Sequence, residues 1–171
     1  MVKLANRTLV LVGTCLGIAG IAQAGDADVL REAKDRAEIE HLMWRYARAL
    51  DSSDAEAYAS VYTDDGQFSA SGNATKGREA LRNMIVGFKQ RNDERRAAGE
   101  TVVQLYHMTA DTYIEFLGPD HARHHSYWLT MAGGTGQENP PRVLAAGRGV
   151  DELVRVNGEW LIKSREVAPQ N

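Results

Sequence analysis

The order of apolar and polar residues divides the chain into a helical first part and a strand-rich second part. Apolar residues at helical spacing predict helices over residues 26–50, 55–62 and 78–97. The run Asp51-Ser52-Ser53-Asp54 ends the first helix and offers an N-cap for the second. The first helix carries its apolar stripe on Ile39, Leu42, Met43, Tyr46 and Leu50.

Residues after Thr101 change to a period of two, which is typical of β-strands. Asn157-Gly158 is the strongest short hairpin signal in the chain. Helices followed by a run of antiparallel strands predict an α+β domain. We therefore expect a cone-shaped α+β barrel, in which a curved antiparallel sheet and three helices enclose a pocket. Four long strands are predicted over residues 103–117, 122–131, 142–156 and 159–167, after a short strand over 67–71 and a loop over 72–77.

Strict alternation along residues 103–117 predicts which side chains share a face of the sheet. One face receives His107, Thr109, Asp111 and Tyr113. The other face receives Tyr106, Met108, Ala110, Ile114 and Phe116. His107 is therefore expected among polar groups, on a strand otherwise suited to burial.

Residues 1–24 have the composition of a secretory signal peptide. Lys3 and Arg7 form a basic start, residues 9–21 are apolar, and Ala22-Gln23-Ala24 fits the small-x-small cleavage pattern. The apolar segment is short for a transmembrane span, which needs roughly 20 residues. We expect cleavage after Ala24, export to the periplasm or out of the cell, and a single domain over residues 25–171.

Charge and cysteine content exclude several classes of function. The whole chain has a net charge of −3, and the leader holds two basic residues and no acidic one, so the exported domain has a net charge of −5. Such an acidic domain is not expected to bind nucleic acid or, after cleavage, a membrane. The single cysteine, Cys15, lies in the leader, so the exported domain has neither a disulfide nor a thiolate nucleophile.

Histidines along residues 121–125 raise the question of a metal site. His121 and His125 are expected on the same side of a strand but roughly 13 Å apart, which is too far for two ligands of one ion. His124 is expected on the opposite side from His125. We therefore predict no metal, and no phosphate-binding glycine loop or nucleophilic serine motif is present in the sequence.

Three residues are candidates for proton transfer and charge stabilisation. Asp51 follows the first helix, and a carboxylate aimed at His107 would fix the imidazole tautomer and raise its basicity. Arg165 follows the apolar segment of the last strand, and an arginine that faces a pocket stabilises a developing oxyanion or enolate. Each has an ordinary structural alternative: a helix end for Asp51, a satisfied polar group for His107 and a surface cation for Arg165.

Several motifs together resemble the SnoaL-like branch of the nuclear transport factor two-like superfamily. The resemblance covers residues 35–167, most of the exported domain. It implies a cone-shaped α+β fold, and it says less about activity because this fold hosts many functions. The motifs are Glu38-Ile39-Glu40-His41-Leu42, Tyr46-Ala47-Arg48-Ala49-Leu50-Asp51, Ala55-Glu56-Ala57-Tyr58, Tyr62-Thr63-Asp64-Asp65-Gly66, Lys76-Gly77-Arg78-Glu79-Ala80-Leu81, His107-Met108-Thr109-Ala110-Asp111 and Gly158-Glu159-Trp160-Leu161-Ile162.

The resemblance implies roles for four residues. Cofactor-free lyases of this superfamily, among them scytalone dehydratase, hexachlorocyclohexane dehydrochlorinase and bile acid 7α-dehydratase, pair an aspartate after the first helix with a histidine on the first long strand. Asp51 and His107 stand at those positions. Tyr46 and Arg165 match a tyrosine and an arginine that recur in part of the group. The sequence departs from these enzymes at the second acid, where it offers Trp128, Thr130 and Ala132, and at Asp111, which replaces a frequent asparagine.

These observations favour a cofactor-independent lyase, either a dehydratase or a related enzyme of base-catalysed elimination. Its expected substrate is a small hydroxylated aromatic or polycyclic molecule. The protein is expected to form a homodimer or homotrimer. Its catalytic residues are expected to be His107, Asp51, Tyr46 and Arg165. The alternatives are a retro-aldol lyase that releases formaldehyde from an aryl-propane diol, a ketosteroid-type isomerase, and a ligand-binding module without catalysis. The predicted substrate pocket consists of Phe68, Tyr62, Tyr58, Met84, Phe88, Trp128, Asp111 and His124.

Overall fold

A computed structural model describes residues 18–70, 72–134 and 136–169 of the chain. The chain divides into two units, residues 1–35 and residues 36–171. The fold and the site described below belong to the second unit. Residues 1–17 of the predicted leader lie outside the described residues, and cleavage after Ala24 stays a prediction. Within the described part of the chain, no helix combines the length and the apolar character needed to cross a membrane.

The three predicted helices are present as α1 (Ile18–Ser52), α2 (Ala55–Ser60) and α3 (Arg78–Ala97). Asp54 caps α2, because its Oδ1 accepts a hydrogen bond of 3.0 Å from the backbone N–H of Ala57. This cap confirms the helix break predicted from the polar run after Leu50. The bounds of α3 agree with the predicted residues 78–97.

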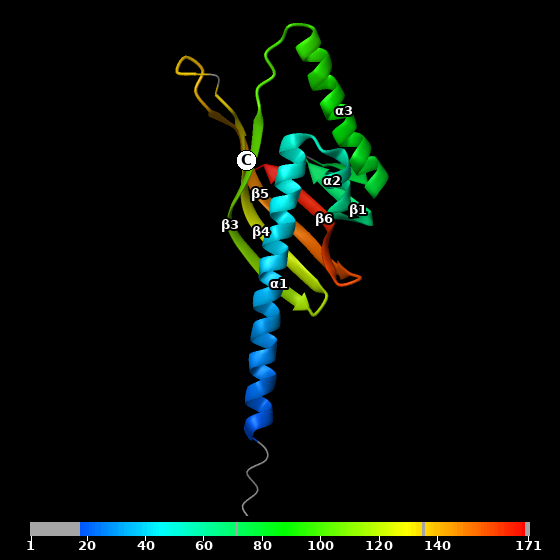
Figure 1. Ribbon diagram of the computed structural model, residues 1–171, viewed down its shortest axis with the longest axis vertical. Coiled ribbons are helices and arrows are strands. Elements are labelled where there is room, and N and C mark those ends of the chain that lie inside the picture. Colours follow the sequence, from blue (N-terminus) through cyan, green and yellow to red (C-terminus); the bar gives the residue numbers. More distant parts are fainter. Residues whose placement is uncertain (1–17, 71, 135, 170–171) are drawn as a thin grey trace, which may run out of the picture. The chain divides into compact units, whose positions relative to one another are not determined.

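Six strands form one sheet in the order β2-β1-β6-β5-β4-β3. The sheet is mixed, since β1 and β6 run parallel and the other neighbours run antiparallel. It is not closed into a barrel. Together with the helices it makes an α+β cone-like fold, which confirms the predicted fold class (Figure 1). The strands are β1 (Tyr62–Ala70), β2 (Asn73–Lys76), β3 (Leu105–Gly118), β4 (His121–Ala132), β5 (Arg142–Val156) and β6 (Glu159–Pro169).

The region between α2 and α3 differs from the prediction. β1 begins at Tyr62 rather than at residue 67, and β2 forms where a loop was expected. The backbone N–H of Ile162 donates to the carbonyl of Val61, and Tyr62 pairs with Ile162 of β6. This parallel pairing joins segments about a hundred residues apart in sequence, so local composition did not reveal it.

The predicted alternation along β3 is wrong beyond Ala110. The register between β3 and β4 shifts between Ala110 and Tyr113, and Asp111 adopts a left-handed φ of +45°. This bulge inserts one extra residue into β3 and so reverses the alternation. Ile114 therefore shares the helix-covered face with His107, while Asp111 leaves that face.

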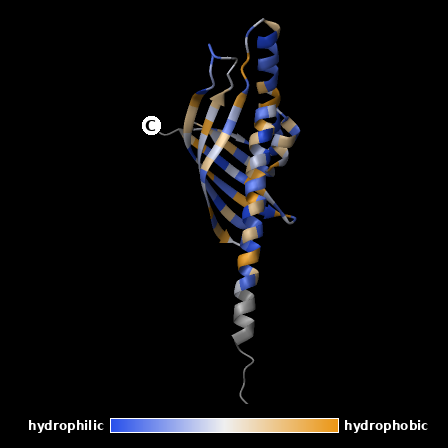
Figure 2. Ribbon diagram, turned by 60° about the vertical axis from the view of Figure 1, so that its left-hand side comes forward, coloured by the Kyte–Doolittle hydropathy of each residue, from blue (hydrophilic) through white to orange (hydrophobic). Residues whose placement is uncertain are grey.

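The register also shifts between β4 and β5 at Thr130/Met131 and between β5 and β6 at Glu152/Leu153. Bands of hydrophilic and hydrophobic residues along the long strands are visible in Figure 2. The Asn157-Gly158 turn has φ angles of +52° and +87°, as a two-residue hairpin turn requires. Val156 and Glu159 pair across it, which confirms the predicted hairpin.

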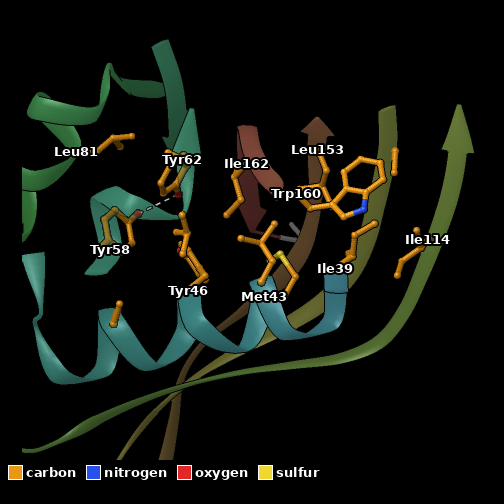
Figure 3. Packing of buried hydrophobic residues seen from close by; sticks show 14 of the residues in the cluster. Ile39, Met43, Tyr46, Tyr58, Tyr62, Leu81, Ile114, Leu153, Trp160 and Ile162 are labelled. Atoms are coloured by element: carbon orange, nitrogen blue, oxygen red, sulfur yellow. Dashed lines mark hydrogen bonds between the residues drawn. The ribbon is translucent and has the colours of Figure 1, made fainter. Parts of the chain in front are cut away.

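The main core lies between the second half of α1, α2, α3 and one face of the sheet (Figure 3). Tyr58 and Tyr62 are fully buried there, and their hydroxyls lie 3.2 Å apart. The largest contributors from each element are Ile39, Leu42, Met43, Tyr46, Tyr58, Tyr62, Leu81, Ile85, Ile114, Leu153, Trp160 and Ile162.

Replacement of Ile162 by alanine tests how much this core contributes to the stability of the fold. Ile162 is fully buried, so Ile162→Ala is expected to lower the free energy of unfolding by about 2–5 kcal/mol. Val156→Ala, at a position that is 40% exposed, is the matched control and should cost less than about 1 kcal/mol. Urea unfolding followed by circular dichroism measures both, and equal costs would contradict the assignment of the core.

Candidate active site

A hydrogen bond between Asp51 and His107 joins the end of α1 to the start of β3. Oδ1 of Asp51 lies 2.7 Å from Nδ1 of His107 and also accepts the backbone N–H of His107 at 3.0 Å. Because a carboxylate oxygen accepts, Nδ1 carries the proton, and Nε2 is left as the basic nitrogen. The Asp51 side chain is 10% exposed and the His107 side chain 27%, so the imidazole is held on one side and open on the other.

The open side of His107 faces a pocket of about 190 Å³. α1, β1, β3, β4, β5 and β6 all contribute to its wall. Most of the wall is apolar or aromatic, and its polar groups come from Tyr46, His107, Thr109, Thr130, Arg165 and the indole N–H of Trp128. The full lining is Tyr46, Ala47, Leu50, Phe68, His107, Met108, Thr109, Trp128, Leu129, Thr130, Ala145, Arg165 and Val167.

Arg165 reaches this pocket from a buried charge cluster. Its Nη1 donates to Oδ2 of Asp151 at 2.6 Å, and the same oxygen lies 2.8 Å from Nδ1 of His124. Asp151, His124 and Arg165 are all buried. The Arg165 guanidinium also lies 4.4 Å from the centre of the Tyr46 ring, a cation–π arrangement. Asp151 and Tyr46 thus hold the cation in place at the pocket wall.

The surroundings of this cluster keep its tyrosines neutral and its arginine charged. Burial, followed by the neighbouring Tyr46, raises the pKa of Tyr58, and burial likewise raises the pKa of Tyr62. Burial is the largest single influence on Arg165 and opposes its charge, but Asp151 together with Tyr46 and Tyr62 outweighs burial and raises the pKa of the guanidinium. The Asp151–Arg165 contact is therefore an ion pair.

The structure brings together five of the predicted site residues. Tyr46, Phe68, His107, Trp128 and Arg165 line the same pocket. Asp51 lies behind His107 and contacts it directly.

Six residues predicted to line the pocket do not line it. Tyr58 and Tyr62 belong to the core, and Met84 packs against that core. Phe88 on α3 is half-buried outside the lining. His124 is buried against Asp151 and is not among the lining residues. Asp111 lies at the β3 bulge and lines a separate surface hollow with Tyr127 and Arg148.

Sequence reasoning missed Asp151. Its neighbours at a period of two, Gly149 and Leu153, are buried on the same face of β5. A lone acidic residue at a buried position of a strand was a signal that could have identified it, because such a charge needs a partner. Register supplies that partner, since Asp151 pairs with Arg165 on one side and with His124 on the other.

Gly147 of β5 makes room for Trp128. A Cβ atom on Gly147 would lie 2.5 Å from Cζ2 of the indole, and one on Gly149 would lie 3.2 Å from Oγ of Ser126. Trp128 therefore packs over the strand where a side chain is missing, and this position sets one wall of the pocket.

Metal-binding geometry is not found among the described residues, which contain no group of three or more His, Cys, Asp or Glu side chains able to hold an ion. His121 is 2.7 Å from Glu152, and His125 is 3.7 Å from Glu115. These two histidines each have their own carboxylate neighbour.

A substitution at Gly147 tests the packing of Trp128 over β5. Gly147→Ala forces the indole or the neighbouring backbone to move, so the free energy of unfolding should fall by about 1–3 kcal/mol. The near-ultraviolet circular dichroism of the tryptophans should change as well. Gly118→Ala is the matched control, because no atom lies within 4 Å of an added Cβ there. Unchanged spectra and stability for Gly147→Ala would contradict this packing.

Comparison with known proteins places the fold among solved structures. The sequence profile described as a SnoaL-like domain matches residues 31–166. A comparison with curated protein sequences gives no match. An NTF2-like protein with a cystatin-like fold from Novosphingobium aromaticivorans is 24% identical, with a TM-score of 0.69 and 92% of each chain covered.

Two further structures are similar. A candidate scytalone dehydratase from Novosphingobium aromaticivorans is 23% identical, with a TM-score of 0.67; the alignment covers 84% of this chain and 89% of that one. A protein from Catenulispora acidiphila in complex with S-DNPA is 28% identical, with a TM-score of 0.65 and coverage of 80% and 94%.

Proposed function

The chain belongs to the SnoaL-like domain family, and we propose that within this family it is a cofactor-independent lyase that eliminates water from a small hydroxylated aromatic substrate. The observation that carries this proposal is the 2.7 Å hydrogen bond between Asp51 and His107 at the wall of a pocket. An imidazole held in this way is the side chain best suited to act as a base near neutral pH.

The proposed reaction begins with Nε2 of His107. It removes a proton from the carbon next to a substrate carbonyl, and the electron pair of that C–H bond moves toward the carbonyl, whose oxygen becomes an enolate oxygen. The enolate electrons then form a C=C bond to the neighbouring carbon as the C–O bond of the β-hydroxyl breaks. The leaving oxygen takes the proton from the imidazolium and departs as water. Asp51 keeps the imidazole in the right tautomer and stabilises its charged form.

Arg165 and Tyr46 have the positions needed to stabilise the enolate oxygen that forms on the way. Both line the pocket beside His107, and Arg165 is held in place by Asp151. Donors that are already oriented toward a developing negative charge lower its energy without reorganisation.

The comparisons support the proposal at the level of family and fold. The candidate scytalone dehydratase shares the fold, and the Catenulispora acidiphila protein is in complex with S-DNPA. Retro-aldol cleavage by the same base, isomerisation, and ligand binding without turnover remain the alternative outcomes of the experiment below.

Replacement of the proposed base is the decisive experiment. We expect the wild-type protein to convert β-hydroxypropiophenone to phenyl vinyl ketone, followed by ultraviolet absorbance. His107→Ala should lower kcat/KM by about 10²–10⁴-fold, because general base assistance is lost. Asp51→Asn should also lower kcat/KM. The asparagine amide can turn its NH₂ group toward Nδ1, which would favour the wrong tautomer of the imidazole.

His125→Ala is the matched control, because this histidine lies 41% exposed beside Glu115 and does not line the pocket. Its turnover should equal that of the wild type. Circular dichroism verifies that all variants are folded. If His107→Ala retains full turnover, the proposed mechanism is wrong. If the wild-type protein shows no elimination, a test for release of formaldehyde from an aryl-propane diol examines the retro-aldol alternative.

Export and self-association complete the proposal. The basic start, apolar segment and Ala22-Gln23-Ala24 motif support secretion with cleavage after Ala24. N-terminal sequencing of the protein from the periplasm or medium tests this, and an uncleaved N-terminus would contradict it.

Exposed Tyr106, Met108 and Tyr113 on β3 support a homo-oligomer. Light scattering of the exported chain measures its mass.

A further inference from the structure

The pocket volume limits the size of a ligand. An apolar cavity of about 150 Å³ is enough to hold benzene, whereas drug-sized ligands occupy pockets of about 300–1,000 Å³. The pocket of about 190 Å³ therefore has room for one ring with a short substituent. This volume is closer to the benzene-sized cavity than to the drug-sized range, which favours a single ring over a fused ring system.

The side chains of the pocket wall are suited to an apolar ring rather than to a sugar or an ion. Leu50, Phe68, Trp128 and Val167 give the pocket apolar and aromatic surface on several sides. Burial of a flat apolar ring against such side chains is favourable, and aromatic pairs add to the gain from burial alone.

The charges at the pocket are already balanced. Of the lining residues, His107 and Arg165 are the ones that carry or can acquire a positive charge. Each is paired with a carboxylate, His107 with Asp51 at 2.7 Å and Arg165 with Asp151 at 2.6 Å. The two pairs have no net charge when His107 is protonated and a net charge of −1 when it is neutral. A ligand carboxylate would lose its hydration without gaining an uncompensated cation.

Two polar donors of pocket-lining residues are nevertheless unused. Nε of Arg165 and Nε1 of Trp128 are buried and have no hydrogen-bond partner among the described residues. Buried donors are nearly always satisfied, so these N–H groups are suited to an acceptor from a ligand. A neutral carbonyl or hydroxyl oxygen serves as such an acceptor without adding charge.

From these observations we infer that the pocket selects an uncharged molecule with a single ring and an acceptor oxygen, such as an aryl ketone, over both carboxylates and two-ring ligands. This inference rests on the proposed function in taking the pocket beside His107 as the substrate site. It narrows the substrate class from any hydroxylated aromatic or polycyclic molecule to neutral monocyclic ones.

Isothermal titration calorimetry at neutral pH tests the inference with three probes. Acetophenone is the neutral single-ring ketone, benzoate is its anionic counterpart of similar size, and methyl naphthyl ketone adds a second ring. Acetophenone is expected to bind at least about tenfold more tightly than either of the others, a difference that calorimetry resolves. Equal or tighter binding of benzoate or of the naphthyl ketone, or no detectable binding of acetophenone, would overturn the inference.

Two neighbouring alanines of β5 provide a matched pair for locating the binding. Ala145 lines the pocket and Ala146 does not, and both are exposed. Ala145→Phe fills the pocket and should abolish acetophenone binding, while Ala146→Phe should leave it unchanged. Equal binding to both variants would show that acetophenone binds elsewhere, which would also overturn the inference.

A third variant tests the role of charge. Asp151→Asn removes the counter-charge of Arg165 and should shift the preference between benzoate and acetophenone by about tenfold toward benzoate. An unchanged preference in the folded variant would contradict the charge argument. If this variant does not fold, the three probes and the Ala145–Ala146 pair still decide the outcome.

Binding and turnover separate the two proposals. Acetophenone lacks a β-hydroxyl, so it reports on the pocket without any reaction. If it binds as expected and no elimination is found, the proposed lyase activity is wrong while the ligand class stands. If elimination occurs with larger or anionic substrates, the ligand class is wrong while the lyase activity stands.

Discussion

The packing of the second half of α1 against the inner face of the sheet is the contact on which the rest of the structure depends. Ile39, Leu42 and Met43 of α1 are buried in one cluster with Ile114, Leu153 and Ile162 of the sheet. Burial of these side chains supplies the largest favourable contribution to folding. Because the helix is held there, its end brings Asp51 to the start of β3, where it meets His107.

The same packing explains why a pocket remains. Toward the end of α1, Ala47 and Leu50 are only partly buried and line a cavity in place of a filled core. The opposite wall has Ala145 and Trp128, and Gly147 of β5 makes room for the indole. Small residues on the sheet thus leave the space that large residues occupy elsewhere in the core.

Two aspartate-centred contacts give the pocket its chemistry, and they differ in exposure. Asp51 holds a histidine that stays open to the pocket, whereas Asp151 holds Arg165 and His124 in the interior. Breaking a buried ion pair leaves an uncompensated charge and is strongly unfavourable. Arg165 is therefore kept in one place, which is what a group that stabilises a developing charge requires.

Much of the fold was determined locally and could be predicted from the sequence by itself. The bounds of α3 and β5, the cap at Asp54 and the turn at Asn157-Gly158 follow from spacing and from single residue types. Asp51, His107 and Arg165 stood out as candidates by their positions and by resemblance to a family. Only the tertiary structure decided the parallel pairing of β1 with β6, the bulge at Asp111 and the partnership of Asp151 with Arg165. Each of these depends on the register between segments far apart in sequence, and register is set by how whole strands pack, which local patterns do not encode.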